Sequence, residues 1–174
     1  MFHMVLRRSV RIAAMSLLVA TTFIALPAGR AAGLAAFTCG TVSGGSSTTY
    51  GHITAVRVGH GIGFDRFVVQ FSSPRVPHFT LTPKSSAVFW LDPSNRRVTL
   101  LGSAGLKLVL HPASGVGTYA GPSDLRPAFP QLREARRIGD FEGYTSWGLG
   151  LHHQACKRVF GLSAPTRLVI DVHT

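Results

Sequence analysis

Apolar residues recur at every second position along much of the chain after residue 50. Phe67, Val69 and Phe71 fall on one side of an extended segment. Arg66 and Gln70 fall on its other side. This period of two is that of a β-strand and argues against a mainly helical fold. The same period is found in residues 50–58, 106–110 and 167–172.

Shorter apolar segments, separated by turn-forming residues, complete the pattern. Gly, Pro, Ser and Asn gather between them and favour turns, as in 59–63 and 92–95. Only 131–137 could be helical, but it is too short and too rich in Arg to bury a face. Many short strands at about ten-residue spacing predict an all-β domain, an antiparallel sandwich or barrel. The shorter strand candidates are 78–82, 87–91, 97–101, 141–151 and 158–162.

The N-terminus has the features of an export signal. Arg7, Arg8 and Arg11 precede a largely apolar, uncharged stretch at 12–26, and small residues follow it. This stretch is shorter than the roughly 20 residues needed to span a bilayer. We therefore predict a cleaved signal peptide over 1–36 and an exported protein, secreted or associated with the cell wall. The pair of Arg7 and Arg8 leaves the twin-arginine and the general secretory route both open.

The chain that remains after cleavage is strongly basic. Its 138 residues include 14 basic and 7 acidic ones, a net charge of +7. We expect residues 37–49, rich in Ser, Thr and Gly, to be a flexible leader and residues 50–174 to be one folded domain. A basic exported protein favours anionic envelope partners such as wall polymers, although a solvated surface without a special ligand is the alternative. Basic clusters are short, and we predict neither a nucleic-acid partner nor a membrane span after cleavage.

Two cysteines, Cys39 and Cys156, lie near the two ends of this mature chain. Export places them where disulfides form, and we predict a disulfide between them. It would close a loop of about 117 residues and stabilise the fold by roughly 4–5 kcal/mol in the chain-entropy model. Two free thiols, or a lipid anchor on Cys39, are the alternatives.

Two segments far apart in the chain resemble each other. Residues 65–71 align without gaps with 166–172, and in each an Arg is followed by apolar residues at every second position. Arg66 shares a strand face with Gln70, as Arg167 does with Asp171. The repeat predicts an antiparallel β-sandwich of two pseudo-symmetric halves, with Arg66 and Arg167 in equivalent places. Chance similarity between apolar strands is the alternative.

Three segments stand in a distinctive order: 65–69 (DRFVV) after a Gly-rich turn, 139–143 (GDFEG), and 164–172 (APTRLVIDV). Together they resemble the AMIN-like domains of exported actinobacterial proteins, over about Ile53 to His173. The related AMIN domain is a β-sandwich of two symmetric halves, found in front of cell-wall amidases and pilus secretins. There it is a targeting module associated with peptidoglycan. The resemblance implies the same fold and a comparable role in the cell envelope.

Sequence patterns for catalysis or metal binding are weak. His152 and His153 would ligate a metal with Cys156 only if that cysteine were not in a disulfide, and we predict neither a metal nor a cofactor. A nucleophile elbow and a phosphate-binding loop are both missing from the sequence. Asp140 and Glu142 could form the carboxylate pair of a glycoside hydrolase, but nearby arginines favour salt bridges. A small hydrolase is therefore the least favoured interpretation.

Aromatic and arginine side chains are the candidates for ligand binding. Sugars bind on aromatic faces, and charged side chains bind their hydroxyls and acidic substituents. Trp90 lies in an apolar segment and is expected in the core, while Trp147, between Ser146 and Gly148, could be partly exposed. The arginines could instead be paired structurally, and Trp147 could also be a core residue. The candidate ligand-binding residues are Arg66, Arg167, Glu142, Tyr144 and Trp147.

These observations predict a non-catalytic, exported module that binds or targets to the cell envelope. The expected ligand is peptidoglycan or an anionic glycan attached to it. The alternative, from a different class, is a protein-interaction module that recruits an envelope enzyme or machine through an exposed sheet edge.

Overall fold

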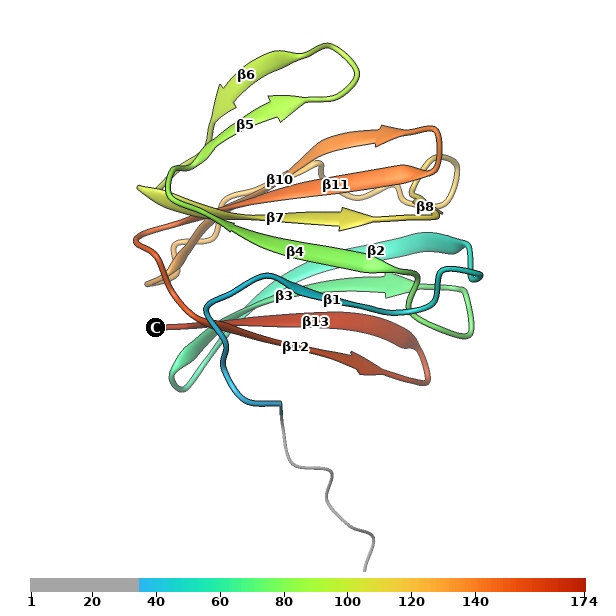
Figure 1. The fold of residues 1–174 in the computed structure, drawn as a ribbon, viewed down its shortest axis with the longest axis horizontal. Coiled ribbons are helices and arrows are strands. Elements are labelled where there is room, and N and C mark those ends of the chain that lie inside the picture. The colour runs from blue at the N-terminus through green and yellow to red at the C-terminus, as the bar shows by residue number, and fades with distance from the viewer. Residues whose placement is uncertain (1–34) are drawn as a thin grey trace, which may run out of the picture. The chain divides into compact units, whose positions relative to one another are not determined.

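Two β-sheets face each other in the computed structural model, which describes residues 35–174 (Figure 1). The six-stranded sheet has the order β1 (Val42–Gly44), β4 (Phe79–Lys84), β7 (Ala104–Leu110), β11 (Tyr144–Leu151), β10 (Leu132–Phe141) and β9 (Asp124–Leu125). The five-stranded sheet has the order β12 (Lys157–Leu162), β13 (Thr166–His173), β3 (Phe64–Phe71), β2 (Gly51–Gly61) and β8 (Ala113–Ser114). A separate hairpin consists of β5 (Val88–Leu91) and β6 (Arg96–Thr99).

The predicted all-β sandwich is confirmed. Neighbouring strands are antiparallel throughout these sheets, except that β8 runs parallel to β2. The described residues contain no helix, and hence none long and apolar enough to cross a membrane. The predicted signal peptide lies outside the described residues, apart from its last two, and stays a prediction.

The strand order contains an internal twofold pattern. In the first half, the hairpin of β2 and β3 in the five-stranded sheet is followed by the pair of β4 and β7 in the six-stranded sheet. In the second half, the hairpin of β10 and β11 in the six-stranded sheet is followed by the pair of β12 and β13 in the five-stranded sheet. The counterparts in the two halves are β2 and β10, β3 and β11, β4 and β12, and β7 and β13. Replacing each strand of the order β12-β13-β3-β2 by its counterpart gives β4-β7-β11-β10, which is the order found in the other sheet. The two pseudo-symmetric halves are therefore confirmed.

The two similar segments that suggested this symmetry are not its equivalent strands. β3 and β13 are neighbours in one sheet, where Arg66 lies opposite Asp171 and Gln70 lies opposite Arg167. The counterpart of β3 is β11, because each is the second strand of its hairpin. Counting from the two turns matches Arg66 with Ser146. The expected equivalence of Arg66 and Arg167 is wrong, because their strands are neighbours in one sheet and not counterparts in the two halves.

The segment that could have been helical belongs to strand β10. Its register shifts between Leu132 and Glu134, while Leu132 and Ala135 are both fully buried. A bulge adds one residue to a strand, so two residues that are three apart face the same core. Such spacing is also that of a helix face. The register of β2 shifts in the same way between Ile53 and Ala55.

The main core lies between the two sheets, around the rings of Phe67 and Trp147. Their centroids are 5.5 Å apart, and both side chains are fully buried. Trp147 is therefore a core residue, which was one of its two interpretations, whereas the core position expected for Trp90 is wrong, since Trp90 is 56% exposed. In β11 the neighbour Gly148 lies on the opposite side of the sheet. The absence of a side chain at Gly148 therefore makes room for the residues that cover that other side, and it says nothing about the exposure of Trp147.

The hairpin of β5 and β6 covers part of the outer side of the six-stranded sheet. Phe89 and Leu100 are the centre of a second buried cluster there. The sheet presents glycines to them: a Cβ on Gly148 would lie 3.1 Å from Leu100, and one on Gly105 only 2.8 Å from Phe89. Because successive side chains of a strand point to opposite sides, the buried Phe89 leaves its neighbour Trp90 facing away from this cluster.

A buried carboxylate connects the two sheets. Asp65 of β3 faces inward and is completely buried. Its Oδ2 accepts hydrogen bonds from the backbone amides of Gln131 and Leu132, at 2.7 and 2.8 Å, where β10 begins. Its Oδ1 lies 2.6 Å from Nδ1 of His60. The bonds satisfy backbone groups that would otherwise be buried without partners, and they fix β10 against β3.

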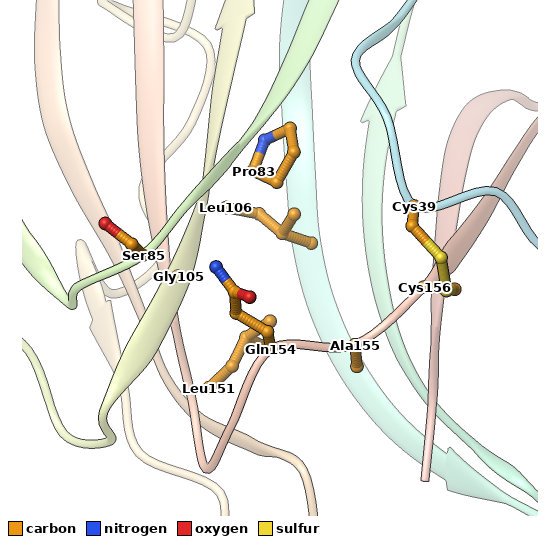
Figure 2. A pocket seen from close by; sticks show the side chains of 9 residues that line it. All are labelled: Cys39, Pro83, Ser85, Gly105, Leu106, Leu151, Gln154, Ala155 and Cys156. Carbon is orange, nitrogen blue, oxygen red and sulfur yellow. A yellow bond between two sulfur atoms is a disulfide. The ribbon is translucent and has the colours of Figure 1, made fainter.

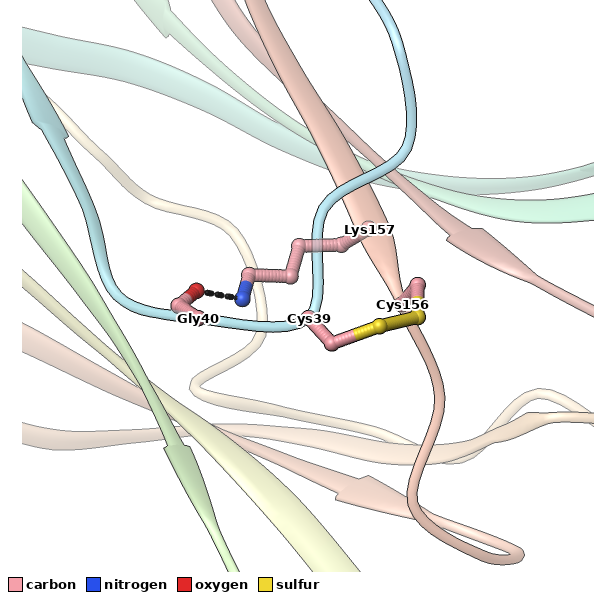
Figure 3. Close-up of a disulfide and its surroundings, with 4 residues drawn as sticks. All are labelled: Cys39, Gly40, Cys156 and Lys157. Carbon is pink, nitrogen blue, oxygen red and sulfur yellow. Dashed lines mark hydrogen bonds between the residues drawn. A yellow bond between two sulfur atoms is a disulfide. The ribbon is translucent and has the colours of Figure 1, made fainter.

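Residues 37–49 belong to the sandwich, contrary to the flexible leader that we expected. β1 pairs with β4, and Thr38 exchanges two backbone hydrogen bonds with Lys157. The predicted disulfide between Cys39 and Cys156 is present (Figure 3), which removes the alternatives of free thiols and a lipid anchor. Beside it, the buried amine of Lys157 donates a hydrogen bond to the carbonyl of Gly40 (Figure 3).

We predict that Asp65→Asn lowers the free energy of unfolding by about 2–4 kcal/mol, because two buried amides lose a charged acceptor. Urea unfolding measures the loss. Asp92→Asn is the matched control, since Asp92 is exposed; its effect should stay within about 0.5 kcal/mol. Equal effects of the two substitutions would contradict the role assigned to Asp65.

A second prediction concerns pH. Burial lowers the pKa of Lys157 below its ordinary value of 10.5. Between the lowered pKa of the folded state and the ordinary pKa of the unfolded state, the unfolded chain binds more protons than the folded chain. The free energy of unfolding of the wild type should therefore rise with pH in this window and level off near 10.5. Lys157→Met removes this contribution. The unfolding free energy of the variant minus that of the wild type should therefore decrease from pH 7 to pH 10 in urea titrations. Lys107→Met, at an exposed amine, is the control; an identical trend there would refute the assignment.

Candidate functional site

The outer side of the five-stranded sheet carries arginines from four adjacent strands. Strand alternation and register place them on one side, because Arg158, Asp171 and Arg66 lie directly opposite one another on β12, β13 and β3. Arg167 shares this side with Asp171, and Arg57 of β2 lies opposite Val68, two residues from Arg66. These residues carry four positive charges and one negative charge, a net charge of +3. We call Arg57, Arg66, Arg158, Arg167 and Asp171 the arginine face.

Asp171 organises one end of the arginine face. Its carboxylate is completely buried and accepts hydrogen bonds from Nε and Nη2 of Arg66, at 2.6 and 2.9 Å. Nε of Arg158 donates a third, at 2.8 Å. The hydrogen bond to Asp171 raises the pKa of Arg66, so this guanidinium remains charged at any physiological pH. One carboxylate balances only one of the two arginines, and this row keeps a charge of +1.

Aromatic rings hold both guanidinium groups of this row in place. The guanidinium carbon of Arg66 lies 4.8 Å from the centre of the Phe64 ring and 5.7 Å from that of Phe160. That of Arg158 lies 4.8 Å from the Phe37 ring and 5.1 Å from the Phe64 ring. Cation–π contacts of this kind, together with the carboxylate, fix the orientation of the planar groups. Both guanidinium groups are therefore held in fixed orientations.

The other end of the face has arginines without a carboxylate. Nη1 of Arg57 donates to the side-chain oxygen of Gln70 at 2.8 Å. Nε of Arg167 donates to the carbonyl of Pro165 at 3.2 Å. Within residues 35–174, neither Arg57 nor Arg167 lies in an ion pair. Both keep N–H groups free, and Arg57 is exposed.

The pseudo-symmetry of the fold shows that a sheet of this kind does not need the charged row. On the six-stranded sheet, the positions equivalent to Arg158, Asp171 and Arg66 form a row of the same register. These counterparts are Thr80, Val109 and Ser146. The same strand architecture is thus built once with charges and once without them. The charged row is a property of one surface and not of the scaffold.

The five residues selected from the sequence do not form one site. Arg66 and Arg167 lie on the arginine face, but Trp147 is buried in the core. Glu142 and Tyr144 lie on the other sheet, at the turn between β10 and β11, where Glu142 has a positive φ of 50°. The Tyr144 ring stacks on His111, with centroids 3.8 Å apart. Glu142 and Tyr144 therefore belong to a separate exposed turn.

The carboxylate of Asp140 has a structural role. It accepts hydrogen bonds from the hydroxyls of Ser114 and Thr145, at 2.9 and 3.0 Å, and from the amide of Gly115 at 3.0 Å. Arg137 forms the salt bridge that the sequence favoured, at 3.3 Å. Since Asp140 is engaged in this way, the geometry offers no free carboxylate pair with Glu142.

A cavity of about 570 Å³ opens beside the disulfide (Figure 2). Leu106 and Leu151 contribute apolar surface, and the side chain of Gln154 also lines the cavity. Cys156, being bonded to Cys39, is not available to a metal. Within the described part of the chain, no group of three or more His, Cys, Asp or Glu residues is placed to hold a metal ion.

Arg57 and Arg158 were not among the ligand-binding residues predicted from the sequence. Alternation had already put Arg57 on the side opposite Val56, and Arg158 opens an apolar segment as Arg66 does. The order of the strands in the sheet was the missing information. Nothing in the sequence shows that β12 and β3 flank β13, which is what brings both Arg158 and Arg66 to Asp171.

Comparison with known families agrees with this architecture. A family model described as the AMIN-like domain matches residues 51–174. The match begins at the first residue of β2 and includes every strand of the arginine face. No curated protein and no solved structure matches the chain.

We predict that Asp171→Asn destabilises the fold by about 2–4 kcal/mol, because two guanidinium groups lose their counter-charge. This is less than the full cost of breaking a buried pair, since the side chain of Arg66 is 34% exposed. Arg167→Gln, on the same strand but outside this cluster, should change stability by about 0.5 kcal/mol or less. Thermal and urea unfolding test both. A neutral Asp171→Asn would show that the row is not held by this carboxylate.

Proposed function

The chain belongs to the AMIN-like domain family, and on that basis we propose that it is an exported, non-catalytic module that binds an anionic polymer of the cell envelope through the arginine face. AMIN-like domains are cell-wall-related modules and occur in exported proteins. The disulfide between Cys39 and Cys156 is consistent with a location outside the cytoplasm.

The excess of charge on the arginine face is the observation that carries this proposal. This face holds four arginines, from four adjacent strands, and only one carboxylate, which binds two of them. The counterpart of Arg57 in the other sheet is Arg136, which lies 3.9 Å from the carboxylate of Asp124. Arg57 has no such partner among the described residues. Charge that the scaffold leaves unbalanced on one side favours an anionic ligand there.

The ligand class follows from the geometry of the free N–H groups. Guanidinium groups bind carboxylate and phosphate through paired, charge-assisted hydrogen bonds. The sheet presents arginines at both ends of this face, so it fits a polymer with repeated negative charges better than a single small anion. Peptidoglycan carrying an attached anionic glycan is the envelope polymer of this kind that we propose.

The two parts of the arginine face have different duties in this proposal. Arg66 and Arg158 are fixed by Asp171, so their replacement would cost stability as well as binding. Arg57 and Arg167 lie outside that cluster, and their replacement isolates binding from folding. They are therefore the residues to change in a binding test.

We predict that Arg57→Gln combined with Arg167→Gln weakens retention by purified sacculi about tenfold or more, with an unchanged melting temperature. Binding is measured by co-sedimentation, at low salt and at about 0.5 M salt, where exposed charges are largely screened. Wild-type retention should decrease at high salt and after removal of the anionic polymers from the sacculi.

The matched control is Arg75→Gln combined with Arg133→Gln, which removes the same charge from exposed positions outside the arginine face. It should leave most of the retention intact. Equal losses in both double variants would reduce the interaction to net charge. Retention that ignores salt and anionic polymers would instead favour the recruitment of an envelope protein.

A further inference from the structure

A groove of about 280 Å³ lies on the other sheet, beside the hairpin of β5 and β6. It lies over the part of the six-stranded sheet that corresponds, by the twofold pattern, to the centre of the arginine face, because Ser146 is both a wall residue and the counterpart of Arg66. The residues lining it that matter here are Trp90, Asp92, Asn95, Lys107, Ile138 and Ser146.

The hairpin that forms this groove breaks the twofold symmetry of the fold. It is inserted between β4 and β7, whereas their counterparts β12 and β13 are joined by a short turn (Figure 1). Phe89 anchors it to the sheet in the second buried cluster. The backbone amide of Asp92 donates to the carbonyl of Ile138 at 2.7 Å, which fixes the far end of β5 against β10. The groove is therefore held in shape from two sides.

Trp90 presents its indole to solvent at this groove. It is 56% exposed, whereas Trp147, the other tryptophan, is fully buried. A single exposed aromatic residue is by itself ordinary on a protein surface. Here, however, it stands beside polar side chains that the protein leaves without partners.

The polar groups of the groove are unengaged. Among residues 35–174, the side chains of Asp92, Asn95, Lys107 and Ser146 take part in no hydrogen bond or ion pair. They offer donors and acceptors of every kind. One acid and one base give the set no net charge, in contrast to the +3 of the arginine face.

We infer that this groove binds a neutral pyranose ring of a glycan, with the apolar face of the ring on the Trp90 indole. The hydroxyls of the sugar are donors as well as acceptors, which matches the carboxylate of Asp92, the amide of Asn95 and the hydroxyl of Ser146. A volume slightly below that of common small-molecule pockets admits a single ring. The site goes beyond the proposed function, since it lies on the other sheet and its chemistry is not that of an anion site.

The inference is tested with two neutral oligosaccharides, the trimer of N-acetylglucosamine and cellotriose, by calorimetry and tryptophan fluorescence. The wild type should bind at least one of them, and the affinity should be the same at low salt and at about 0.5 M salt. Binding should change the fluorescence, because one tryptophan is exposed at the groove. Absence of saturable binding for both sugars would overturn the inference.

Trp90→Ala should weaken binding about tenfold or more. Its melting temperature should change little, since the ring is largely exposed. Ser146→Ala, on β11 and outside the hairpin that carries the indole, should also weaken binding. Tyr144→Ala removes an exposed aromatic ring that does not line the groove and is the control; a loss equal to that of Trp90→Ala would overturn the assignment of this groove.

The double variant of Arg57 and Arg167 separates this inference from the proposed function. It should bind the neutral sugars as the wild type does, even though its retention by sacculi is weak. Conversely, Trp90→Ala should keep the salt-dependent part of sacculus retention. Loss of sugar binding in the arginine variant would place the sugar on the arginine face and refute the groove.

Discussion

The completely buried carboxylate of Asp65 fixes how the two sheets meet. An ionised group in the core is costly unless it is fully hydrogen-bonded. Asp65 meets this condition by binding two backbone amides at the start of β10 and the ring of His60. β3 and β10 belong to different halves and different sheets, so one side chain sets their spacing. The next two residues of β3 make the contacts on its two sides: Arg66 points outward and binds Asp171, and Phe67 points inward and packs near Trp147.

The twofold scaffold carries two unlike outer surfaces. The five-stranded sheet contains the hairpin of the first half and a pair of strands from the second half, and the six-stranded sheet contains the hairpin of the second half and a pair of strands from the first. A row of three residues across the centre of each sheet is therefore equivalent in both. One row is Arg158, Asp171 and Arg66, and the other is uncharged and has Ser146 at the place of Arg66. The hairpin of β5 and β6, inserted on the six-stranded sheet only, makes the two outer surfaces different in shape as well. Equivalent backbones can therefore present a surface rich in arginine on one sheet and an uncharged row beside a groove on the other.

The alternation of apolar residues predicted the buried side of a strand correctly where the strand is regular and wrongly where it contains a bulge. The alternation in β3 and β13 gave the correct inward and outward residues. In β10, a bulge between Leu132 and Glu134 brings Leu132 and Ala135 onto one side, and the spacing imitates a helix. The position of Trp90 was predicted wrongly, and that of Trp147 was left open, for a related reason. Trp147 stands beside glycine because the hairpin needs room on the opposite side of the sheet, and a single strand does not reveal what covers each side.

The all-β class, the family resemblance and the strongly basic character of the chain follow from the sequence alone, which also favoured, without establishing it, the disulfide between Cys39 and Cys156. These depend on local alternation, on composition and on there being only two cysteines. The tertiary structure alone decided that Arg158 and Arg66 share Asp171, that Trp90 is outside and that Trp147 is inside. The physical reason is that strand neighbours are chosen by long-range packing. Alternation tells which residues share a side of a strand, but only the assembled sheets decide which side is buried and which charges meet.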